Sequence, residues 1–241
     1  MLVSRKAAGT LFVGGALGMT LGSLLYPAML GVQKVSSAPE RVVATPATGP
    51  LTEADRDFVV EVRSAGLWEY PVGQRASKKG TTKAVRNAGK QLVDGDASLD
   101  AASRKVADQL GITLPNQPSP QQQSFETRLN SETGKQFDTD LATTLRATNG
   151  QFLTTIASVR TTTRNSLVRA LADQANDTVL DHITAVEKTG LVDFSQALAQ
   201  ETTSPGLPAQ DLTPPPAVAG QPQVVLTPPA NSRVSPSPTA G

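Results

Sequence analysis

The sequence contains no cysteine, which excludes disulfides, thiolate nucleophiles, cysteine-ligated zinc sites and iron–sulfur clusters. A chain without disulfides is stabilised by packing alone, and this requires a reasonably large apolar core. Aromatic residues are scarce, at 4% of 241 residues, and the formal net charge is only +1. Because a nucleic-acid-binding protein usually presents a basic surface, this charge predicts no nucleic-acid partner.

Charge is also missing from one long segment near the N-terminus. No Asp, Glu, Lys or Arg lies between Lys6 and Lys34. A bilayer core requires about 20 apolar residues, whereas the apolar part of a signal peptide usually has about 7–15. We therefore expect residues 7–32 to form a signal anchor that crosses a cell membrane once and provides the membrane contact of the protein. Arg5 next to Lys6 favours a cytoplasmic position for residues 1–6.

A cleaved signal peptide is the alternative interpretation of this segment, with the cut near Ser37 and a secreted product. In both interpretations the rest of the chain lies outside the cytoplasm, in the cell envelope. Gly14, Gly18 and Gly22 share one helix face because they are spaced at i, i+4 and i+8. Such a face lets two membrane helices approach closely and predicts self-association, although glycine is also frequent in membrane helices in general.

Composition divides the remaining chain into three parts. Residues 33–50 are rich in Pro, Ala and small polar residues, which predicts a linker. Residues 199–241 contain ten of the 18 prolines of the chain and no aromatic residue. This composition predicts a disordered, polyproline-like tail, because the segment has too little apolar surface to offset its ordering entropy. The folded domain is therefore expected at residues 51–198.

Apolar residues within residues 51–198 recur at helical spacing, and no segment alternates with the period of a strand. Thr52 and Asp55 form a capping-box pattern at the start of the first helix. Pro71 is expected to kink or interrupt that helix, and Gly111 is expected to end the next one. Helices are predicted from Thr52 onward and at about residues 82–110, 121–132, 137–162 and 165–188. The pattern predicts an all-α protein, a four-helix bundle with one longer central connection.

Each long helix also carries one polar residue in its apolar stripe. These residues are Glu69, Asp96, Asn149 and His182, and His182 is the only histidine of the chain. Burying such groups without partners costs roughly 2–7 kcal/mol each. They are therefore expected to meet one another, a water molecule or a metal ion in the core.

Three stretches carry a resemblance to a known family: LTEADRDFVVEVRSAGLWEYPVGQRA, KQLVDGDASLDAASRKVADQLGITLP and TVLDHI. They resemble an exported, ferritin-like bacterial family named domain of unknown function 4142, whose members are sometimes labelled outer-membrane proteins. The stretch TTTRNSLVRALADQANDTVLDHITAVEKTGLVDF is most similar to the actinobacterial branch of that family. The resemblance covers about residues 51–195 and implies a ferritin-like fold.

The resemblance also relates the four polar residues to the family pattern. His182 matches the histidine of the family's last helix, and Glu69 matches the glutamate of its first helix. Asp96 and Asn149 occupy positions where family members often have histidine. This departure changes the set of metal ligands that the family pattern would offer.

Two interpretations of the polar residues remain open. A ferritin-like di-iron site requires Glu-x-x-His motifs, and the sequence contains none. A single iron, manganese or zinc ion would suit the carboxylates of Glu69 and Asp96 and the imidazole of His182, with Asn149 as a polar partner behind these ligands. The alternative is a hydrogen-bonded polar cluster that fixes helix register and binds no cofactor.

Three functions are compatible with this chain. The first expectation is a non-enzymatic, membrane-anchored envelope protein that acts through interaction or structure, with envelope partners that the sequence does not identify. The second is a metal-binding or redox-related protein that uses the residues above. The third is a small-ligand-binding bundle, which a cavity lined by Trp68 and apolar side chains would favour.

Overall fold

The computed structural model describes residues 41–202 and 208–228. The predicted signal anchor at residues 7–32, its glycine face and the alternative cleavage position near Ser37 lie outside the described residues. Within the described ranges, no helix combines the length and the apolar character needed to cross a bilayer.

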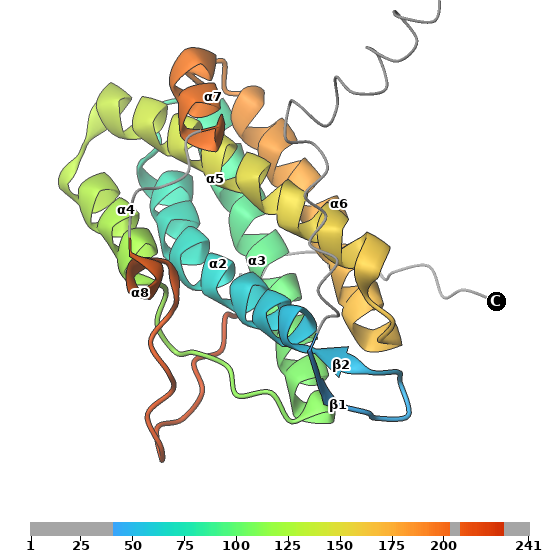
Figure 1. Ribbon diagram of the computed structural model, residues 1–241. Helices are drawn as coiled ribbons and strands as arrows, with labels where there is room; N and C mark the ends of the chain where they lie inside the picture. Colours follow the sequence, from blue (N-terminus) through green and yellow to red (C-terminus); the bar gives the residue numbers. More distant parts are fainter. Residues whose placement is uncertain (1–40, 203–207, 229–241) are drawn as a thin grey trace, which may run out of the picture. The chain divides into compact units, whose positions relative to one another are not determined.

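Four long helices pack as a bundle in the described part of the chain (Figure 1). They are α2 (Glu53–Lys79), α3 (Lys83–Leu110), α5 (Gly134–Thr162) and α6 (Ser166–Glu187). Helix α2 contacts α3 and α5, and α6 contacts the same two helices, so that the four enclose a shared core. The prediction of long helices packed as a bundle is confirmed.

Three shorter helices lie against this bundle, and the sequence predicted only the first of them. They are α4 (Pro120–Ser131), α7 (Phe194–Thr202) and α8 (Ala209–Leu212). Helix α4 lies in the longer connection between α3 and α5 and contacts α2 and α5. Helix α7 packs on α5, and α8 packs on α4. The structure therefore continues beyond residue 198, where the folded domain was expected to end.

The helix ends follow from capping residues that are visible in the sequence. Thr52 Oγ1 accepts a hydrogen bond from the Asp55 N–H at 3.1 Å, and Asp55 Oδ2 accepts one from the Thr52 N–H at 3.0 Å. At the start of α6, Asn165 Oδ1 accepts a hydrogen bond from the Leu167 N–H at 3.1 Å. Gly111 ends α3 with a φ of 67°, a left-handed conformation that glycine adopts without strain.

Helix α2 continues through Pro71, so the predicted interruption at this residue is wrong. A proline inside a helix removes one backbone hydrogen bond and costs about 3 kcal/mol. This cost is offset because apolar residues on both sides of the proline, such as Trp68 and Val72, are buried. Packing of α2 along the length of α3 therefore outweighs the local preference of one residue.

A short β-hairpin precedes α2, where the sequence predicted a linker and no strand. Strands β1 (Val42–Ala44) and β2 (Leu51–Thr52) pair antiparallel. The turn between them is fixed to the start of α6, because Asn165 Nδ2 donates to the Gly49 carbonyl at 3.0 Å. A side chain at Gly49 would collide with the backbone just before α6. Strands of three and two residues are too short to reveal a strand period in the sequence.

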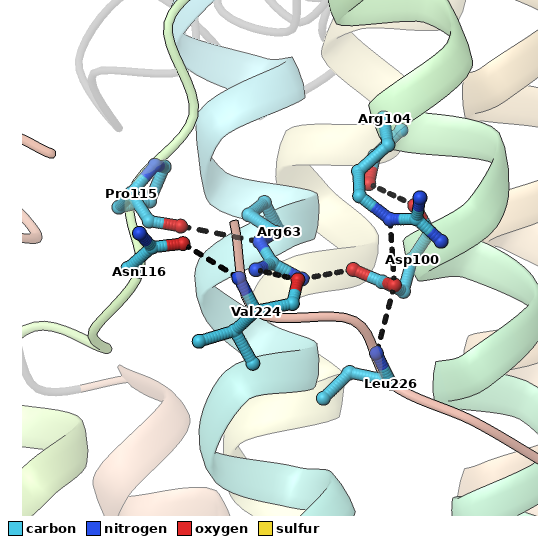
Figure 2. Close-up of polar contacts among 8 residues, drawn as sticks. Arg63, Asp100, Arg104, Pro115, Asn116, Val224 and Leu226 are labelled. Carbon is cyan, nitrogen blue, oxygen red and sulfur yellow. Dashed lines mark hydrogen bonds and ion pairs between the residues drawn. The ribbon is translucent and has the colours of Figure 1, made fainter. Parts of the chain in front are cut away.

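The prediction of a disordered Pro-rich tail is wrong for residues 208–228. Two parts of this segment dock on the rest of the structure: α8 contacts α4, and Leu226 is only 7% exposed. Figure 2 shows that buried side chains of α2 and α3 bind the backbone of this segment. Arg63 Nη2 donates to the Val224 carbonyl at 2.7 Å. The Leu226 N–H donates to Asp100 Oδ2 at 3.0 Å.

We call residues 222–227 the strap, and its other hydrogen bonds also involve its backbone. Asn116 Oδ1 accepts from the Val224 N–H at 3.0 Å, and Asn116 Nδ2 donates to the Pro222 carbonyl at 3.3 Å. The Tyr70 hydroxyl donates to the Thr227 carbonyl at 2.5 Å. Because the bundle binds backbone groups of the strap, the side-chain pattern of the strap gives little indication of this docking.

Candidate metal centre

The four polar residues that were predicted to face the core form one layer across the bundle. They are Glu69 of α2, Asp96 of α3, Asn149 of α5 and His182 of α6. On each helix the polar residue lies between apolar residues of two separate core clusters, as Glu69 does between Val62 and Val72. The polar layer therefore divides the apolar core into two halves.

Three residues of the layer bring possible metal ligands together. Glu69, Asp96 and His182 each offer one ligand atom, and these atoms all lie within 4.8 Å of one another. Their exposed fractions are only 5%, 3% and 2%, respectively. Two carboxyl groups and one imidazole thus face each other in a space that is screened from water.

Two neighbours in the layer hold Glu69 in position. Asn149 Nδ2 donates to Glu69 Oε1 at 3.2 Å and to the Leu145 carbonyl at 3.0 Å. His182 Nδ1 lies 3.4 Å from Glu69 Oε2. In contrast, Asp96 Oδ2 and His182 Nε2 are buried and have no hydrogen-bond partner among the described residues. Native cores rarely leave buried polar atoms unpaired, so these two atoms require an explanation.

The electrostatics of the layer favour a positive charge among its carboxyl groups. Burial raises the pKa of the Asp96 carboxyl well above its usual range, and the negative charges of Glu69 and Asp100 raise it further. Asp96 therefore binds a proton more tightly than an exposed carboxyl group does when no cation is near. A metal ion would replace that proton and neutralise the repulsion between the carboxylates.

Gly95 is part of the site although the sequence analysis did not single it out. A Cβ atom at this position would lie 2.4 Å from His182 Nε2 and 2.8 Å from Thr178 Cγ2. The imidazole therefore occupies the space that a side chain at residue 95 would fill. The available sequence signal was a glycine inside a long helix, which costs about 1 kcal/mol relative to alanine and suggests a packing reason.

A cavity of about 700 Å³ reaches the layer at Glu69. Its walls come from α2, α4 and α5, and from residues 212–214, which are the last residue of α8 and the two residues after it. Trp68, Phe125 and Phe152 contribute aromatic surface, and Glu61 contributes a carboxyl group. Trp68 lines the cavity, as the small-ligand hypothesis expected, but polar side chains contribute to the lining as well as the apolar ones that it named. Its residues come from four segments, and only Trp68 and Glu69 among them were predicted from the sequence as site residues.

The strap approaches the layer at Asp96. A Cβ atom on Gly66 would lie 3.3 Å from Leu226 Cδ1 and 3.8 Å from Asp96 Cβ. Leu226 therefore packs where Gly66 leaves room between α2 and α3, next to Asp96. The layer is thus bordered by the strap at Asp96 and by the cavity at Glu69.

Comparison with protein families places the layer within a recognised domain. The model of a domain of unknown function (DUF4142) matches residues 40–189, which is more than half of the chain and includes all four residues of the layer. No curated protein and no solved structure matched the chain. The family description assigns no role, so the function has to be argued from the residues themselves.

Proposed function

We propose that this chain, which belongs to the DUF4142 family, binds one divalent metal ion through Glu69, Asp96 and His182. The observation that carries the proposal is the convergence of one ligand atom from each of three helices within 4.8 Å. The unpaired Asp96 Oδ2 gives further support, because a hydrogen-bonded core cluster would have used it.

The ligand chemistry favours iron, manganese or zinc, since these ions accept carboxylate and imidazole ligands together. Asn149 would orient Glu69 through its hydrogen bond, as polar groups behind the ligands of metal sites usually do. The sequence contains no Glu-x-x-His motif, so the ligand set provides for a single ion and not for a ferritin-type di-iron pair.

In this proposal the metal belongs to a ferritin-like, non-enzymatic protein of the cell envelope. The uncharged segment at residues 7–32 would anchor the chain in the cell membrane, with the bundle on the extracytoplasmic side. Cleavage near Ser37 would release the same bundle as a secreted protein. The support for this location comes from the N-terminal sequence, whereas the support for the metal comes from the layer.

The metal content of the purified full-length chain tests the proposal. Separate samples are equilibrated with iron(II), manganese or zinc and desalted, and the bound metal is quantified by mass spectrometry. We expect the wild type to retain about one ion per chain, and His182→Ala and Asp96→Asn each to lose affinity by at least about tenfold. Asp181→Asn is the matched control, because Asp181 adjoins His182 and is exposed.

Circular dichroism confirms that each variant is folded before its metal content is compared. Retention of the ion in both His182→Ala and Asp96→Asn would contradict the proposal. A folded wild type that binds none of the three ions would also contradict it. That second result would favour the hydrogen-bonded cluster that fixes helix register.

A further inference from the structure

The cavity beside α2 is large enough for an organic ligand. Its volume of about 700 Å³ lies within the range of roughly 300–1,000 Å³ that is typical of small-molecule sites. A neighbouring hollow of about 500 Å³ shares Asp57, Glu61, Thr154 and Thr155 with it. Glu61 therefore lies where the two spaces meet, and this makes its carboxyl group central to what the cavity can bind.

All charged residues that line the cavity belong to α2. They are Arg56, Asp57, Glu61 and Glu69, whereas α4, α5 and residues 212–214 contribute only neutral side chains. Arg56 donates from Nε and Nη2 to Asp57 Oδ1 at 3.1 and 2.9 Å, so this guanidinium is already paired. The lining thus offers Glu61 no basic partner of its own, and the surplus charge of the lining is negative.

Glu61 is a carboxyl group in a partly dry environment. Burial raises its pKa to about 7, the nearby charge of Asp57 raises it slightly, and a hydrogen bond from Thr155 partly opposes the increase. An ammonium group beside Glu61 would supply the counter-charge that the lining lacks. A ligand carboxylate or phosphate at the same place would instead add to the repulsion.

Aromatic side chains line the same cavity as this carboxyl group, and of these Trp68 is only 1% exposed. The rings of Trp68 and Phe125 pack with centroids 5.7 Å apart, and Phe152 also lines the cavity. Aromatic faces attract organic cations as well as apolar groups. Hydroxyl and amide side chains such as Ser64, Thr148 and Gln151 complete the wall with neutral hydrogen-bonding groups.

We propose that this cavity binds a small organic amine, with the ammonium group at Glu61 and an apolar or aromatic body against Trp68 and Phe125. Amine binding here is independent of the metal proposal, because it involves the carboxyl group of Glu61 and the rings and requires no ion at Glu69. The ligand class is therefore a cation with an apolar flank.

Fluorescence of Trp68 provides the readout, because Trp68 is the only tryptophan of the chain and lines the cavity. The metal-free full-length chain is titrated with benzylamine, benzyl alcohol and phenylacetate at neutral pH. These probes share a benzyl group and differ in charge. We expect saturable binding of benzylamine, weaker binding of benzyl alcohol and the weakest binding of phenylacetate.

Two variants locate the binding site. Glu61→Gln removes the carboxylate and should weaken benzylamine binding by roughly tenfold or more, with little effect on benzyl alcohol. Ala65→Phe places a ring in the cavity lining and should weaken both probes. The matched controls are Asp108→Asn and Ala101→Phe, which change exposed residues of α3 outside the lining and should bind like the wild type.

Phenylacetate binding as tight as benzylamine binding would overturn the proposal, because the cavity would then not select a cation. Unchanged benzylamine affinity in both Glu61→Gln and Ala65→Phe would also overturn it, because the amine would then bind elsewhere. Absence of benzylamine binding to the folded wild type would do the same. The metal content of the wild type does not affect these outcomes.

Discussion

Arg63 and Glu61 lie two residues apart in α2, but they differ strongly in the hydrogen-bond and charge partners that their neighbours offer them. Arg63 is 1% exposed and donates hydrogen bonds to Asp100 and to two backbone carbonyls, one of them in the strap. Glu61 faces a cavity whose lining offers it no basic partner of its own, and burial raises its pKa. Fully paired buried charges fix the position of a segment, whereas poorly paired groups in a cavity are typical of binding sites.

The polar layer lies between these two regions and shares features of both. Asn149 and His182 hold Glu69 in place, as the partners of Arg63 do on the strap side. Asp96, however, has a raised pKa and an unpaired oxygen, which resembles the situation of Glu61. An incompletely satisfied group marks a candidate site only where other ligand groups lie beside it, because the buried atoms Arg75 Nε, Glu132 Oε2 and Asp138 Oδ1 also lack a hydrogen-bond partner among the described residues and lie outside the layer.

The largest effect on stability is expected when the buried ion pair between Arg63 and Asp100 is broken. Arg63→Ala leaves the Asp100 carboxylate buried with fewer partners and removes the hydrogen bond to the strap, so it should lower the free energy of unfolding by about 3–5 kcal/mol. The measurement is urea unfolding followed by circular dichroism. Arg160→Ala is the control, because its pair with Asp173 is exposed and should contribute less than about 1 kcal/mol. Equal losses in the two variants would refute the comparison.

A somewhat smaller effect is expected from the strap itself. Leu226→Ala removes the apolar side chain that packs against Gly66 and should cost about 2–3 kcal/mol in the same unfolding experiment. Val225→Ala is the neighbouring control, because Val225 is 54% exposed and should change stability by less than about 0.5 kcal/mol. If both changes are neutral, the strap does not stabilise the bundle.

The third prediction concerns the space around His182. Gly95→Ala places a Cβ atom against the imidazole and should destabilise the protein by about 1–3 kcal/mol, despite the better helix propensity of alanine. In the His182→Ala background the ring is absent, so adding Gly95→Ala should cause little further loss of stability. Additive effects in this double-mutant cycle, measured by thermal unfolding, would show that Gly95 does not accommodate the ring.

The fourth prediction concerns Glu61→Gln, whose effect on stability should depend on pH. The pKa of Glu61 rises from 4.5 to about 7 on folding, so the folded state binds the proton more tightly than the unfolded state. This contribution to stability is complete below pH 4.5 and is lost as the pH rises toward about 7. The glutamine side chain of the variant does not titrate. Between pH 4.5 and about 7, the free energy of unfolding of the variant should therefore rise relative to that of the wild type by roughly 1–3 kcal/mol. Above this range the difference between the two proteins should stay constant. Urea unfolding at several pH values measures the difference, and parallel curves for the two proteins would contradict the prediction.

The positions of Glu69, Asp96, Asn149 and His182 could be predicted from the sequence because they rest on local periodicity. Each lies at helical spacing from apolar neighbours, and a helix that buries its stripe must also bury the polar residue within it. The caps at Thr52 and Gly111 were predictable for the same reason, since the signal lies within a few residues.

The strap and the cavity could not be predicted because their contacts are distant in the sequence. Arg63 resembles any charged residue of a helix until Asp100, 37 residues away, and Val224, 161 residues away, are brought to it. The Pro-rich composition of the tail predicted disorder because it offers few apolar side chains, but the bundle binds its backbone. The cavity depends on three helices and residues 212–214 together, so no single stretch carries its signal.

A crystal of the protein soaked in zinc and measured at the zinc absorption edge tests the central claim most directly. The account predicts one anomalous peak in the polar layer, about 2.0–2.2 Å from a nitrogen of His182 and from carboxylate oxygens of Glu69 and Asp96. An empty layer, with Asp96 hydrogen-bonded to its neighbours and zinc only at surface positions, would contradict it.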